Sequence, residues 1–399
     1  MTDAVAIVGG RVVTGLGEEF EGGTVLVADG RIRAVGAGIA VPDGARVIDA
    51  GGCWVMPGLI DPHSHIGAHE EANGPAGFDG SEVSSPVTAG VRAIDAINIE
   101  DTAFRDALAG GITAVVVKPG SGNPIGGQSV AIKTAGGRSV DEQVIRAALG
   151  MKSALGENPK QAYGERKQLP STRLGIALVI RQALSDAQDY AARRDRARAD
   201  GAPFAVDLGK QALTEALDGT LAWEQHAHRH DDIATALRIA DEFGLRLVIN
   251  HGTEAHKLAD VLADRDVPVI FGPILSSRSK VEVRESDPAN LAALAAAGVR
   301  VALTTDHPVV PIGLLALQAA VAVRAGLPRQ TALAAMTSTA AAIAGIDDRV
   351  GALEPGRDAD VVLWTGDPLE VASTVREVLI EGRSVYTAPA APAARGVSG

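Results

Sequence analysis

Residues 231–252, "DDIATALRIADEFGLRLVINHG", decide the fold. The segment up to Gly244 has apolar residues at helical spacing, which predicts an amphipathic helix that ends at this glycine. The rest is an apolar run of strand length that stops at His251 and Gly252. A helix followed directly by a buried strand is the repeating unit of an α/β protein with a parallel sheet.

The same unit recurs on both sides of this segment. Short apolar runs that end in Gly, Pro, His or Asp occur at "GITAVVVKPG" (111–120), "VPVIFGP" (267–273) and "VRVALTTDHP" (299–308), and the last follows the helical pattern "NLAALAAAG" (290–298). Because the alternation extends from residue 58 to about residue 347, it predicts the α/β class and a (β/α)₈ TIM barrel.

The two ends of the chain have a different pattern. Short β-branched runs separated by glycines fill residues 4–58, with turn dipeptides at Asp29-Gly30 and Asp43-Gly44, and similar runs return at 358–367 and 375–387. We therefore expect residues 1–57 and 348–389 to form a small β-sandwich domain beside a barrel of residues 58–347. The low-complexity tail, residues 390–399, is predicted to be disordered.

Composition and charge exclude several classes of partner. The 399-residue chain has a net charge of −12 and 3% aromatic residues, which argues against a nucleic-acid partner. Cys53 is the only cysteine, so no intrachain disulfide can form, and a metal would be held by His and carboxylate groups. We find no signal-peptide pattern and no apolar run near the roughly 18 residues of a membrane span. The expected setting is the cytoplasm, with a small-molecule substrate and no membrane partner.

A dense block of charges, "RQALSDAQDYAARRDRARAD", covers residues 181–200. Opposite charges four residues apart support an exposed helix. The block therefore predicts a helix with a solvated charged face.

Histidines gather at the ends of the predicted barrel strands. In "GLIDPHSHIG" (58–67), His63 and His65 are two residues apart, so in an extended chain their rings share a face. His226, with His228 two residues later, follows a mid-chain strand, and His251 ends the next one. Asp306 ends the last strand, and this rim is the catalytic face of such barrels.

This combination predicts a metal site. A single histidine at a strand end is more often a packed side chain, but four imidazoles and a carboxylate at successive strand ends suit a hydrolytic Zn²⁺ site. A two-metal site also needs a bridging anion. In "GMKSALGENPKQAYG" (150–164), Glu157 is the preferred candidate and carbamylated Lys152 the alternative.

The chain resembles the amidohydrolase superfamily, in its imidazolonepropionase-related branch. The resemblance covers nearly the whole chain, through "DGRIRAVG" (29–36), "VMPGLIDPHSH" (55–65), "HAHRHDD" (226–232), "INHGTEAH" (249–256), "TTDHPVVP" (304–311) and "VGALEPGRDADVVLW" (350–364). It implies a barrel with a β-sandwich from both termini, and two divalent metal ions, most readily Zn²⁺. The implied ligands are His63, His65 and Asp306 for the first ion and His226 and His251 for the second, with Glu157 or carbamylated Lys152 between them.

Imidazolonepropionases are similar to a one-metal type that lacks a bridging residue, so a one-metal site stays open. By the same resemblance, Asp306 is the catalytic residue that accepts a proton from water and passes it to the leaving nitrogen. A homo-oligomer is a further expectation from the family.

The substrate is predicted less sharply. Candidate substrate-binding residues are Lys118, Asn123 and Gln128 in a Gly-rich loop, His228, and Arg278 or Lys280 in "PILSSRSK" (273–280). The leading hypothesis is metal-dependent hydrolysis of a C–N bond in a cyclic amide or a small N-acyl or peptide-like substrate. The alternatives are hydrolytic deamination of a heterocyclic amine, and a non-catalytic barrel, which the complete set of candidate ligands disfavours.

Overall fold

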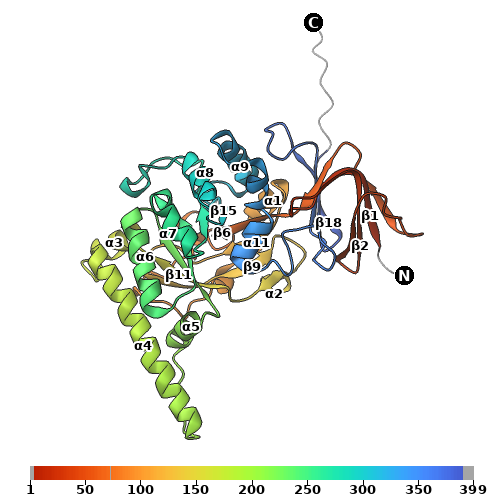
Figure 1. Ribbon diagram of the computed structural model, residues 1–399. Helices are drawn as coiled ribbons and strands as arrows, with labels where there is room; N and C mark the ends of the chain where they lie inside the picture. Colours follow the sequence, from red (N-terminus) through yellow and green to blue (C-terminus); the bar gives the residue numbers. More distant parts are fainter. Residues whose placement is uncertain (1–3, 72, 390–399) are drawn as a thin grey trace.

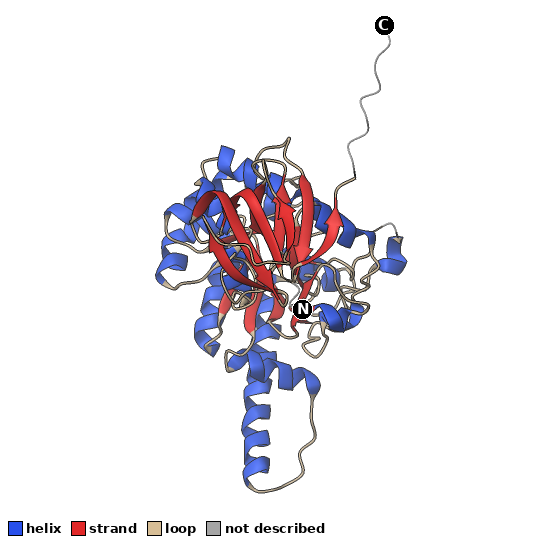
Figure 2. Ribbon diagram, turned by 90° about the vertical axis from the view of Figure 1, so that its right-hand side faces the viewer, coloured by secondary structure: helices blue, strands red, loops and turns tan. Residues whose placement is uncertain are grey.

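The computed structural model describes residues 4–71 and 73–389 (Figure 1). A β-rich part built from the first and last described strands lies beside a larger part in which helices surround strands (Figures 1 and 2). The predicted disordered tail falls outside the described residues.

Both ends of the chain contribute strands to one sheet. Its order is β18-β17-β16-β5-β1-β2-β3, with β4 paired to β1, and the two chain ends meet where β16 runs antiparallel to β5. Alternate apolar residues such as Ile7, Val55 and Leu363 form a core of their own. The predicted pair of facing sheets is not seen in the described residues, because the strands join into a single sheet. These strands are β1 (Val5–Val13), β2 (Glu19–Ala28), β3 (Arg31–Gly36), β4 (Arg46–Asp49), β5 (Trp54–Pro57), β16 (Val361–Trp364), β17 (Val375–Ile380) and β18 (Arg383–Thr387).

The remaining strands form the centre of the larger part in two sheets. One has the order β10-β9-β7-β6, and the other has the order β15-β14-β13-β12-β11-β8. Neighbours from β11 to β15 run parallel, as do β6 and β7. The strands are β6 (Leu59–Ser64), β7 (Ile112–Val117), β8 (Ile125–Gln128), β9 (Val130–Lys133), β10 (Val144–Arg146), β11 (Gly150–Ala154), β12 (Ala222–Ala227), β13 (Leu247–His251), β14 (Val269–Phe271) and β15 (Val301–Leu303).

The segment with β8 and β9 departs from the predicted alternation. Only Ser129 separates the two strands, and they run antiparallel to β11 and β7 respectively. The chain returns from β7 through the glycine-rich loop 119–124 without a helix, and a connection this short permits only an antiparallel neighbour. The result is a TIM-barrel-like fold of mixed strand direction.

Helices cover the outside of these sheets. Helix α6 ends at Gly244, which has the left-handed φ of 68° that glycine adopts freely, and it buries Ile233 and Leu237. Helix α4 is the longest, and it extends well beyond the body (Figures 1 and 2). In the part of the chain that the structure describes, no helix combines the length and apolarity needed to cross a membrane. The helices are α1 (Thr102–Ala109), α2 (Val140–Gln143), α3 (Glu157–Gly164), α4 (Arg173–Ala199), α5 (Leu208–Leu217), α6 (His230–Phe243), α7 (Ala259–Asp264), α8 (Ala289–Ala296), α9 (Leu315–Arg324), α10 (Arg329–Ala334) and α11 (Ser338–Ala344).

Candidate metal centre

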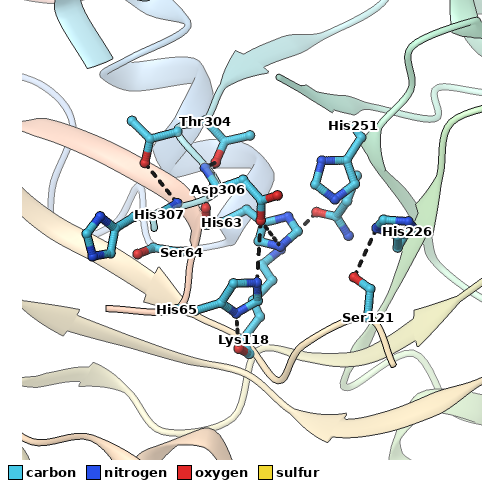
Figure 3. A network of polar contacts seen from close by, with 12 residues as sticks. His63, Ser64, His65, Lys118, Ser121, His226, His251, Thr304, Asp306 and His307 are labelled. Atoms are coloured by element: carbon cyan, nitrogen blue, oxygen red, sulfur yellow. Dashed lines mark hydrogen bonds and ion pairs between the residues drawn. The ribbon is translucent and has the colours of Figure 1, made fainter. Parts of the chain in front are cut away.

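Five of the predicted ligands meet at the carboxyl ends of the strands. His63 lies on β6 and His65 just after it, His226 on β12, His251 at the end of β13, and Asp306 after β15 (Figure 3). Asp306 Oδ1 lies 3.4 Å from Nε2 of His63 and 3.4 Å from Nε2 of His65. The ring of His251 lies 4.8 Å from that of His63 and 4.5 Å from that of His226, between centroids.

Hydrogen bonds hold three of these rings with Nδ1 turned away from the centre. His65 Nδ1 lies 2.8 Å from the Lys118 carbonyl oxygen, and His226 Nδ1 lies 2.9 Å from Ser121 Oγ (Figure 3). His251 Nδ1 lies 2.8 Å from the Gly272 carbonyl oxygen. A histidine fixed through one nitrogen presents the other as a metal ligand. Nε2 of His226 is buried and has no hydrogen-bond partner within residues 4–71 and 73–389. The donor set therefore fits a divalent metal ion.

The donors form two overlapping groups. His63, His251 and Asp306 make one, and His226, His228 and His251 make the other, with the ligand atoms of each group within 4.8 Å of one another. His251 belongs to both, and because its Nδ1 is bound to the Gly272 carbonyl it offers one nitrogen, which can ligate one ion at a time. His228 stacks on His251, and its Nδ1 lies 2.8 Å from Thr253 Oγ1.

Burial sets the protonation states that metal binding requires. It lowers the pKa values of His63, His226 and His251 well below the usual range, so these imidazoles are neutral at pH 7. Burial alone would raise the pKa of Asp306, but His251, His65 and Lys152 outweigh it and lower this pKa to about 2. The centre therefore offers neutral nitrogens and an ionised carboxylate.

Lys152 and Glu157, the two bridging candidates, have different surroundings. Lys152 lies within β11 and is fully buried, with Nζ 3.1 Å from His63 Nε2. Burial, more than any neighbour, lowers its pKa to about 7. Glu157 starts helix α3, after β11 has ended at Ala154, and its backbone N–H donates to Glu282 Oε2 at 2.9 Å. The structure thus brings Lys152, rather than the preferred Glu157, into contact with a predicted ligand.

Asp61, which the sequence interpretation passed over, connects β6 to the segment that follows β15, beneath the candidate metal centre. It is fully buried and accepts hydrogen bonds from the His63 N–H at 3.1 Å, the Thr305 N–H at 3.0 Å and the Thr304 hydroxyl at 2.7 Å. These bonds hold the chain at Asp306, whose φ of 51° is in the left-handed region that such residues rarely adopt. The sequence signal that could have identified Asp61 as a buried, structural carboxylate was its position inside the apolar run of residues 58–62.

A cavity of about 500 Å³ opens above the centre. It has the size of a small-molecule site. The wall combines polar groups with a few apolar side chains: His65, His69, Phe78, Ser121, His226, His228, Leu275, Ser276, Ser277, Ser279, Lys280, Asp306 and Val309. His228 and Lys280, two of the candidate substrate-binding residues, are part of this wall.

The other four substrate-binding candidates have partners within the protein and are not part of this wall. Lys118 Nζ is buried 2.9 Å from Glu224 Oε1. The Asn123 amide donates to the Glu82 carbonyl at 2.6 Å, that of Gln128 to the Ala89 carbonyl at 3.3 Å, and the Arg278 guanidinium to the Ser286 carbonyl at 2.7 Å.

Glu282, which also escaped the sequence interpretation, lies beside the second group of histidines. It is fully buried, and its Oε1 lies 3.9 Å from Nε2 of His226 and 3.9 Å from Nε2 of His228. Lys280 Nζ lies 3.3 Å from the same oxygen, so the charges of this pair offset each other. The residue lies in the short 3₁₀ helix Val281–Val283 after β14, which is too short for a periodic pattern to have pointed to it.

Comparison with known proteins agrees with this architecture. Residues 54–385 match the family described as "Amidohydrolase family". Amidohydrolase tasK of Hapsidospora irregularis is 30% identical over 94% of this chain, although the match spans only 41% of tasK. The imidazolonepropionase of Polaromonas sp. strain JS666 is 29% identical over 87% of this chain and 84% of its own. The solved structure of an amidohydrolase from Thermotoga maritima MSB8 is 42% identical, with a TM-score of 0.94 over 96% of this chain and 100% of that one.

These similarities confirm the resemblance seen in the sequence, including its imidazolonepropionase-related character. The chain belongs to the amidohydrolase family and is a hydrolase that acts on carbon–nitrogen bonds.

Proposed function

We propose that this amidohydrolase is metal-dependent and cleaves the C–N bond of a cyclic amide or of a small N-acyl or peptide-like substrate. The observation that carries the proposal is the convergence of neutral imidazoles and the ionised Asp306 at the floor of a cavity of about 500 Å³. The family is typically metal-dependent, which supports the same conclusion.

His63, His65 and Asp306 would hold a first ion, and His226 and His251 a second. Nitrogen and carboxylate donors suit Zn²⁺. The bridging anion is the carbamate of Lys152, in our proposal, formed when its neutral amine adds CO₂ and releases a proton. Burial and the pKa of about 7 keep a large part of this amine neutral near pH 7, and the contact with His63 puts it beside the ligands.

A divalent ion held at this centre supplies Lewis-acid activation of water and of the scissile carbonyl. Asp306, ionised at pH 7, accepts the proton of the attacking water and then passes it to the leaving nitrogen. Burial lowers the pKa of His228 to about 4, so its ring is neutral. In the tautomer that carries its proton on Nε2, His228 would accept from the Thr253 hydroxyl through Nδ1 and donate its Nε2–H to the oxyanion that develops on the carbonyl oxygen.

We also propose that residues 58–347 form one closed barrel and that residues 1–57 and 348–389 form a second domain. Closure between β15 and β6 is supported by the bond from the His65 N–H to the His307 carbonyl oxygen at 3.0 Å. Thr304 Oγ1, whose proton Asp61 and the His63 carbonyl share, also lies 2.5 Å from that carbonyl oxygen.

A substrate screen with zinc-loaded protein tests the function. It would cover hydantoins, lactams, N-acyl amino acids and dipeptides, and it would include aminoheterocycles for the alternative reaction. A new carboxylate without ammonia from an amide supports the proposal, whereas ammonia from an aminoheterocycle would identify a deaminase. Asp306→Asn is the matched inactive control, and turnover that survives both this change and metal removal would contradict the proposal.

A further inference from the structure

The projecting helix α4 carries one continuous exposed stripe. Its residues follow each other at spacings of three and four, which places them on one face of the helix. From the body to the tip they are Leu178, Gln182, Asp186, Asp189, Arg193 and Arg196, all exposed. The stripe is therefore apolar near the body, acidic in the middle and basic towards the tip.

This order of charges is complementary to itself when two copies are placed antiparallel. Asp189 and Arg193 are equally far from residue 191, and so are Asp186 and Arg196. A two-fold axis at residue 191 therefore aligns both acidic residues of one copy with both basic residues of the other, in one register. Such a self-complementary contact is the isologous interface of a C₂ dimer.

The base of helix α4 adds a recess near the place where the end of the partner's helix falls in this register. A groove of about 480 Å³ lies there, lined by residues that include Leu169, Leu178 and Asp186, and the two leucines are each 56% exposed. In the same register, Ala199, the last residue of the partner's helix, falls opposite Ala183, which lines the groove. The turn that follows Ala199 is exposed and reads Asp-Gly-Ala-Pro, so mostly small residues lie next to the recess.

Contacts within the single chain fix the orientation of helix α4. Arg194 donates to Gln211 at 3.1 Å and to Thr214 at 3.3 Å on α5, and the Tyr190 and Phe204 rings are 5.1 Å apart. Figure 2 shows the chain leaving the body along α4 and returning through an open loop to α5.

We propose that α4 is a dimerisation arm, which pairs antiparallel with the same helix of a second copy of this chain and places its tip over the partner's groove. Within one helix, Asp189 and Arg193 form an exposed ion pair of 3.0 Å. In the dimer, each of these two residues also faces the oppositely charged residue of the partner's pair.

Sedimentation velocity of the full chain at micromolar concentrations tests the proposal. We expect a species of twice the 40.8 kDa chain mass, which dissociates as the salt concentration rises. D186R/D189R makes the stripe wholly basic and R193D/R196D makes it wholly acidic. Each variant alone should weaken the dimer at least tenfold, and an equimolar mixture of the two should restore it.

D141R/E142R on α2 is the matched control for D186R/D189R, because it makes the same change in net charge on exposed residues outside α4. It should leave the dimer intact, and circular dichroism would show that every variant is folded. A wild-type chain that stays monomeric, or a dimer whose dissociation constant neither reversal changes, would overturn the proposal.

Discussion

The environment of Lys152 leads to a prediction about covalent chemistry. Only a neutral amine adds CO₂, and an ordinary lysine with a pKa of 10.5 is neutral in roughly one molecule in 3000 at pH 7. With its pKa lowered to about 7, mainly by burial, Lys152 is neutral in about half of the molecules. The reactive fraction is therefore roughly a thousandfold larger than for a surface lysine.

¹³C NMR of zinc-loaded protein in ¹³C-bicarbonate measures the product directly. We expect one carbamate resonance that disappears in Lys152→Gln and persists in Glu157→Gln. The rate at which it forms should fall as the pH drops below about 7, because protonation then removes the neutral amine. The reasoning is refuted if zinc-loaded wild type shows no carbamate, or if the resonance remains in Lys152→Gln.

Three further substitutions test the proposed roles of single groups. Asp306→Asn should reduce kcat by about 10²–10⁴-fold while elemental analysis still finds metal, since an amide cannot accept the proton of water; near-normal turnover would remove Asp306 from this role. Ser121→Ala frees Nδ1 of His226 and should weaken binding of the second ion by about 10–100-fold in a chelator competition, whereas an unchanged affinity would show that the hydroxyl does not orient the ring. Lys118→Met leaves Glu224 without its buried partner and should lower the free energy of unfolding in urea by about 3–5 kcal/mol. Adding Glu224→Met should recover much of that loss, and a Lys118→Met protein as stable as wild type would argue against the ion pair.

The helix-and-strand unit of residues 231–252 could be predicted because local periodicity decides it. The structure has α6 and β13 there, with the helix ending at Gly244 as expected. The direction of β8 could not be predicted in the same way. It depends on the loop at 119–124 making a tight return instead of a helical crossover, and composition does not distinguish the two.

The residues of the candidate site also divide into those that the local sequence predicts and those that it does not. His63, His226, His251 and Asp306 follow from strand ends, because parallel strands bring their carboxyl ends to one rim. The choice between Lys152 and Glu157 depended on where β11 stops. Pairing with β12 and β8 determines that end, and the sequence Ser-Ala-Leu-Gly at 153–156 would have allowed a longer strand. Ser121 lies in a turn and Glu282 in a three-residue 3₁₀ helix, and tertiary contacts rather than local sequence decide where such short segments lie.

Metal content per chain tests the central claim most directly. His251 is the informative position, because it is one of the two histidines proposed to hold the second ion. Elemental analysis of zinc-reconstituted wild type should find about two equivalents per chain, and a folded His251→Asn variant should lose most of the second. If reconstituted wild type holds no metal, or if His251→Asn still holds two equivalents, these side chains are not the metal centre of this hydrolase.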